Sequence, residues 1–202
     1  MRQLSSIVKK ECAGYFASPI AYIVISVFLV VAGWFFFSTF FLYGQATMRN
    51  FFSLLPVIFS LVIPAITMRL FSEELNTGAY ELLATLPVTR PEIILGKFAA
   101  GLVMTAAMLV PTLVYPVCIS FLGDLDWGPV AGGYMGALLL GGAFSAIGLF
   151  ASSMTRNQII AFILGAAICM GLTLIDQMLI FFPGTLVGFF QYLGRSEERR
   201  VG

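Results

Sequence analysis

The chain has 202 residues, of which 59% are hydrophobic and 10% charged, and its formal net charge is +1. Soluble domains carry about 25% charged residues, so we expect lipid to be the main solvent of this chain, and the near-neutral charge argues against nucleic acid as a partner. It has no histidine and only three widely spaced cysteines, which excludes Ser-His-Asp and Cys-His catalytic sets and leaves almost no metal ligands.

The first predicted element is an amphipathic helix over residues 4–18. Apolar residues recur there at helical spacing beside Lys9 and Lys10, and such a helix can lie in the headgroup layer. The alternative is a cytoplasmic extension of the first span. We predict no removable signal peptide, because the polar start is not followed by a small-residue cleavage site.

Five apolar stretches follow, each long enough to cross a bilayer as a helix, which takes about 20 residues. None shows the two-residue alternation of a barrel strand. The predicted fold is therefore an all-α, polytopic transmembrane helical bundle with an N-terminal interfacial helix. The predicted spans are residues 20–42, 51–68, 94–122, 130–154 and 159–182.

The basic residues predict the orientation of the bundle, because cytoplasmic segments are enriched in Lys and Arg. Seven of them lie before span one, between spans two and three, and between spans four and five, whereas the loop between spans one and two has only Arg49. We therefore expect a cytoplasmic N-terminus and an outward-facing loop at Asp124–Trp127.

The link between spans two and three is too long for a plain connector, since helix–helix loops usually take two to eight residues. Span two is predicted to continue as a polar helix to Asn76, where Gly78 stops it in the left-handed conformation. A short helix over residues 80–86 follows and ends at Pro87. Thr89 and Glu92 fit a capping box that starts the next helix. A compact helix with an apolar face and a charged rim suits docking to a partner.

This link resembles the cytoplasmic coupling segment of ABC-2 type permeases, and most closely that of the gliding-associated branch. The most specific part is residues 68–74, Met-Arg-Leu-Phe-Ser-Glu-Glu, followed by Gly78, Tyr80–Leu83, Leu86–Val88, Arg90 and Gly96–Lys97. The resemblance covers residues 1–194 and implies a bacterial inner-membrane permease that pairs with a cytoplasmic ABC ATPase. It also implies a second permease copy or a paralogue, and six spans in each protomer.

Gly96–Lys97 is not a phosphate-binding loop, because Phe98 follows it and the upstream glycine is missing. The chain is therefore predicted not to be an enzyme, and Mg-ATP is expected to bind the partner subunit. With the resemblance, the candidate ATPase-coupling residues are Glu73, Glu74, Glu81 and Arg90. The alternative is a solvated charged face without a partner.

Asp176 is a charge inside the predicted fifth span, where it costs about 2.5–3.5 kcal/mol at mid-helix. It is a candidate for the substrate path, and the alternative is that it reaches water at the outer boundary. Small residues in spans four and five permit close helix contact within the chain. The aromatic residues Phe35–Phe37, Phe40 and Phe41 at the end of span one are predicted to contact lipid and anchor the interface; the alternative is a ligand cage.

Residues 195–202 differ from the rest of the chain, because three arginines lie on the predicted outer side. We expect the native chain to continue differently after Gly194 and to include a sixth span. The predicted function is a permease that couples ATP hydrolysis by its partner to movement of a substrate. A non-transporting membrane anchor of a motility or envelope complex remains the alternative. A membrane-embedded enzyme is disfavoured, because it would need convergent polar groups within the spans and only Asp176 qualifies.

Overall fold

The computed structural model describes residues 2–43, 48–79, 89–121 and 125–181, and within those ranges every regular element is an α-helix. The chain divides into two compact units, residues 1–170 and residues 171–202. The first unit holds α1 to α8 and the first half of α9. The second unit is described only for the end of α9.

Within the described residues, five helices or helix pairs are long and apolar enough to cross a membrane, which confirms the prediction of an all-α bundle with five spans. These five are α2 (Pro19–Tyr43), α3 with α4 (Arg49–Thr67 and Arg69–Thr77), α6 with α7 (Arg90–Thr112 and Val114–Ser120), α8 (Trp127–Ser153) and α9 (Gln158–Phe181). A separate helix, α1 (Arg2–Ala17), precedes them.

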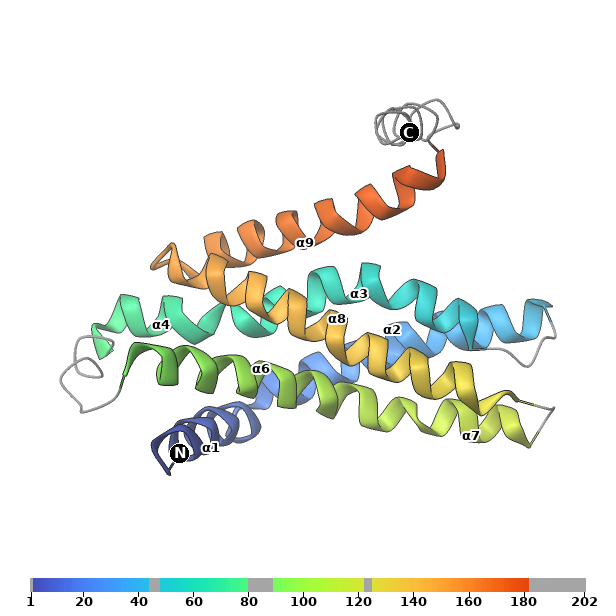
Figure 1. Cartoon of the computed structure of the whole chain (residues 1–202), viewed down its shortest axis with the longest axis horizontal. Coiled ribbons are helices and arrows are strands. Elements are labelled where there is room, and N and C mark those ends of the chain that lie inside the picture. The colour runs from blue at the N-terminus through green and yellow to red at the C-terminus, as the bar shows by residue number, and fades with distance from the viewer. Residues whose placement is uncertain (1, 44–47, 80–88, 122–124, 182–202) are drawn as a thin grey trace, which may run out of the picture. The chain divides into compact units, whose positions relative to one another are not determined.

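Within the first unit, α8 runs between α3 and α6 and packs on both of them (Figure 1). Its inward face is made of small residues, including Gly141, Ser145, Gly148 and Ser152, all of them buried. A Cβ atom at Gly148 would overlap the hydroxyl of Thr67 on α3, so only glycine permits this crossing. By contrast, a Cβ at Gly132 would meet nothing within 4 Å.

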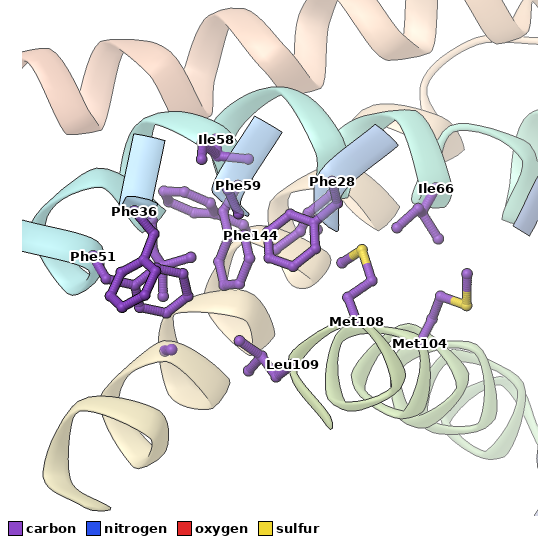
Figure 2. Close-up of a cluster of buried hydrophobic side chains, with 14 of the residues drawn as sticks. Phe28, Phe36, Phe51, Ile58, Phe59, Ile66, Met104, Met108, Leu109 and Phe144 are labelled. Atoms are coloured by element: carbon purple, nitrogen blue, oxygen red, sulfur yellow. The ribbon is translucent and has the colours of Figure 1, made fainter. Parts of the chain in front are cut away.

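The centre of the bundle is filled with aromatic and methionine side chains from α2, α3, α6 and α8 (Figure 2). The rings of Phe28 and Phe59 lie 5.8 Å apart. Phe36 stacks on Tyr115 at 4.9 Å and is only 5% exposed, so the prediction that Phe35–Phe37 faces lipid is wrong for Phe36. Phe35 and Phe37 are 48% and 42% exposed, so their contact with lipid stays a prediction, and the side chains of Phe40 and Phe41 lie outside the described ones. Helical periodicity explains the difference, because neighbouring residues on a helix point about 100° apart.

The break between α6 and α7 has a local cause in Pro116. Proline has no N–H, so the carbonyl of Thr112, four residues earlier, loses its helical partner. The hydroxyl of Tyr134 on α8 donates to that carbonyl at 2.9 Å and replaces the lost bond. The kink therefore joins α6 to α8 instead of leaving a buried carbonyl unpaired.

Candidate functional site

Charged residues gather where two helical pairs extend beyond the length that a bilayer needs. The α3–α4 pair spans 29 residues and the α6–α7 pair 31 residues, whereas about 20 residues cross the hydrocarbon core. The part of the first pair that exceeds this length is α4, which carries Arg69, Glu73 and Glu74. The corresponding part of the second pair is the start of α6, which carries Arg90 and Lys97. The link over residues 78–89 joins these two projecting ends.

Lys97 is the centre of this charged end, and its side chain is only 1% exposed. Its ammonium group lies 2.9 Å from Glu74 Oε1 on α4 and 3.2 Å from Glu11 Oε1 on α1, and it donates to the Leu70 carbonyl at 2.6 Å. An ammonium group has three N–H donors, so these three acceptors use all of them. The cation also lies 5.1 Å from the centroid of the Phe71 ring. A charge this deeply buried costs several kcal/mol unless it is paired in this way.

We call Lys97, Glu11 and Glu74 the Lys97 clamp, because they join three helices that are distant in sequence. The two glutamates are each 15% exposed. Glu74 Oε2 is buried and has no hydrogen-bond partner within the part of the chain that the structure describes. With two carboxylates around one ammonium, the clamp carries a net charge of −1 when all three groups are ionised.

Two further contacts hold α1 against the bundle. The Tyr15 hydroxyl donates to the Ile66 carbonyl on α3 at 3.0 Å, and burial raises the pKa of this phenol, so it stays a neutral donor. At Gly96 a Cβ atom would lie 2.6 Å from Cγ2 of Ile7, so glycine lets α1 approach α6 closely. The apolar face of α1 therefore packs on protein; whether its other face lies in the headgroup layer stays a prediction.

Ser152 on α8 forms hydrogen bonds with the backbone where α3 ends and α4 begins. Its hydroxyl oxygen accepts hydrogen bonds from the backbone N–H groups of Phe71 and Ser72, both at 3.0 Å, and donates to the Met68 carbonyl at 2.7 Å. These backbone groups belong to the first turn of α4, where N–H groups have no helical partner. One serine therefore fixes the start of α4 to α8.

The two ends of the link behave as predicted. Gly78 ends α4 with a φ of 73°, a left-handed conformation that glycine adopts without a Cβ clash. At the start of α6 the backbone N–H of Thr89 donates to Glu92 Oε2 at 3.0 Å, and the Thr89 hydroxyl donates to the same oxygen at 2.8 Å. These bonds lower the pKa of Glu92, because they stabilise its charged form.

A comparison with protein-family models matches residues 35–191 to the ABC-2 family transporter protein. The chain belongs to the ABC-2 transporter family. This ABC-2 chain is thus a multi-pass membrane component, the permease subunit of an ABC transporter, and not the ATPase. A search of curated proteins finds no match. Glu74 and Lys97 lie within the matched range, whereas Glu11 lies before it.

The predicted coupling residues of this ABC-2 chain fall into different environments. Glu73 pairs with Arg69 one helical turn away at 3.1 Å and is 46% exposed. Arg90 is exposed at the start of α6. Glu74 instead points inward to Lys97. Glu81 and the predicted short helix lie outside the described residues, and so does the side chain of Asp176 on α9.

Lys97 and Glu11 were not among the predicted site residues. The signal for Lys97 was present, because it is the only charged residue between Glu92 and Asp124, and a charge within an apolar run needs a partner. No sequence pattern pairs it with Glu11, which is 86 residues away. Only the packing of α1 on α6 brings the two together.

Proposed function

We propose that this permease is driven by a separate cytoplasmic ABC ATPase that docks on the link over residues 78–89 and on the exposed charges beside it. The Lys97 clamp is the observation that carries the proposal. It joins α4 and α6, the two helices that flank the link, at a single buried point. A displacement of the link therefore acts on both helices together and cannot be absorbed by bending one of them.

The same contacts give a route from the link into the bundle. Glu11 passes the displacement to α1, and Ser152 passes it to α8. Because buried polar contacts and close packing do not stretch, α1, α4, α6 and the end of α8 move as one rigid body. In this proposal the partner subunit binds Mg-ATP, and its closure supplies the displacement.

The residues divide into two roles on this basis. Glu73 and Arg90, which are exposed, contact the ATPase together with Glu81. Glu74 acts inside the permease as a positioning residue, because its carboxylate is occupied by Lys97. Asp176 remains a candidate for the substrate path, and a second copy or a paralogue completes the transporter in the bacterial inner membrane, with the N-terminus in the cytoplasm.

The proposal is tested by coexpressing the permease with ATPase subunits encoded next to it. Arg90→Glu is expected to reduce both co-purification of the ATPase and stimulation of its activity after reconstitution. Arg49→Glu is the matched control, since Arg49 is exposed at the start of α3, the end of that helix opposite to α4. Unchanged co-purification and stimulation for substitutions at Glu73, Glu81 and Arg90 would contradict the docking site. Co-purification without any stimulation of ATPase activity in the unmodified complex would favour the membrane anchor.

A further inference from the structure

A cavity of about 410 Å³ lies between α1, the start of α2, the end of α3 and α4. One wall carries charges of both signs, from Lys10, Glu11, Arg69, Glu73 and Glu74. Another part of the lining, the apolar wall, includes Ile20, Val24, Ile66 and Met104. The Lys97 clamp borders this cavity through Glu11 and Glu74, but the function proposed above makes no use of the space itself.

The cavity lies at the level where the first span begins. Helix α1 ends at Ala17 and the span starts at Pro19, so the charged wall is placed beside the end of the hydrocarbon core, where lipid headgroups lie. From the apolar wall, Ile20, Ile23 and Val27 continue along one face of α2, with exposed fractions of 45%, 59% and 54%. Headgroup-like polarity at one end and an exposed apolar track at the other match the two parts of a phospholipid.

The charged wall has both donors and acceptors to spare. Among the described residues, Arg69 donates its Nε–H to Glu73, and a guanidinium has five N–H donors. Lys10 is exposed on α1. On the acceptor side the Lys97 donors are all used, and Glu74 Oε2 has no partner in the described part of the chain. Two cations can thus bind a phosphate while the carboxylates accept from an ammonium group.

We propose that this cavity binds a phospholipid with a zwitterionic headgroup that ends in a primary ammonium, as in phosphatidylethanolamine. A purely anionic headgroup could bind Lys10 and Arg69 through its phosphate, but it brings no ammonium group to donate to the carboxylates of Glu11, Glu73 and Glu74. A choline headgroup carries a positive charge but has no N–H to donate, so it leaves the carboxylates without hydrogen bonds. The acyl chains follow the exposed face of α2.

The test uses the purified full-length permease without the ATPase, so that its result is independent of the docking proposal. The delipidated protein is incubated with phosphatidylethanolamine, phosphatidylcholine or phosphatidylglycerol in mixed micelles, and retained lipid is counted by native mass spectrometry. Arg69→Gln/Glu73→Gln removes charges that are 33% and 46% exposed and leaves the Lys97 clamp in place. Gly14→Leu fills the cavity without touching a charge, because a Cβ at Gly14 meets nothing within 4 Å.

Two control variants distinguish a change in the cavity from a general effect of substitution on lipid binding. Gly132→Leu makes the same change at a glycine on α8 that also has open space, and Arg156→Gln removes a charge outside the cavity. We expect the wild type and both controls to retain phosphatidylethanolamine in preference to the other lipids. Both cavity variants should retain it roughly tenfold less, as expected for loss of charged hydrogen bonds or of space. Equal retention of the three lipids by the wild type, a preference for phosphatidylglycerol, or unchanged retention in both cavity variants would overturn the proposal.

Discussion

The centre of the bundle and its charged end are held together by different physics. In the centre, ring contacts such as Phe28 with Phe59 and the close crossing at Gly148 depend on shape. At the charged end, a buried ammonium and two carboxylates from distant helices determine which helices meet. Lipid is as apolar as leucine, so helices in a bilayer gain little from burying apolar surface and need close packing or polar contacts. Close packing predominates in the centre, and ion pairs predominate at the charged end.

The largest loss of stability is expected from removing the central cation of the charged end. Lys97→Met leaves Glu11 and Glu74 facing each other in a buried site, and we expect a loss of about 3–5 kcal/mol in the free energy of unfolding. The measurement is denaturant unfolding in detergent. Lys97→Met/Glu11→Gln/Glu74→Gln should recover much of that loss, because no unpaired charge remains.

The triple variant also separates stability from coupling. If the Lys97 clamp transmits motion, the recovered fold should still bind the ATPase and yet show reduced transport-linked stimulation. Full stimulation in the triple variant would show that the clamp serves stability alone.

In the centre of the bundle, an added side chain at a close helix crossing is expected to destabilise the fold. Gly148→Leu forces a side chain into Thr67, with the Pro64 backbone close behind it. We expect destabilisation of about 1–3 kcal/mol or a failure to form a monodisperse protein, checked by size-exclusion chromatography and thermal unfolding. Gly132→Leu should match the wild type, and equal damage from both variants would contradict the assignment of an inward face to α8.

A smaller effect is expected at the boundary between the two regions. Tyr15→Phe removes the hydrogen bond to the Ile66 carbonyl and should cost about 0.5–1.5 kcal/mol. Tyr22→Phe is the control, because Tyr22 is 56% exposed. Denaturant unfolding in detergent measures both variants. Identical stabilities would mean that Tyr15 does not anchor α1.

The smallest predicted effect is local and depends on pH. The pKa of Glu92 is lowered in the folded protein by its bonds from Thr89, so the stabilisation is present above the ordinary pKa of 4.5 and is lost as pH falls through the folded value. The protection of amides at the start of α6 against hydrogen exchange, relative to their intrinsic rate at the same pH, should therefore fall below pH 4.5. Glu92→Ala should exchange faster at neutral pH and lose this dependence on pH.

Local chemistry explains why parts of the charged end were predictable. Gly78 stops α4 and the Thr89–Glu92 box starts α6 because both signals act within one helical turn. The inward position of Glu74 was not predictable beside Glu73, since both residues are acidic and adjacent. The direction of each side chain depends on how α4 packs on α8 and which of its flanks then meets Lys97.

The amino-acid sequence was enough to predict a bundle of membrane helices with a charged link between the second and third spans. Its apolar runs are long enough to cross a bilayer, and in lipid the backbone must form its own hydrogen bonds. Three features come from the packing of the helices: Lys97 meets Glu11 and Glu74, Ser152 fixes the start of α4, and a cavity with charges of both signs remains between α1 and α4. These features join residues that are far apart in the chain, and their positions follow from how whole helices pack.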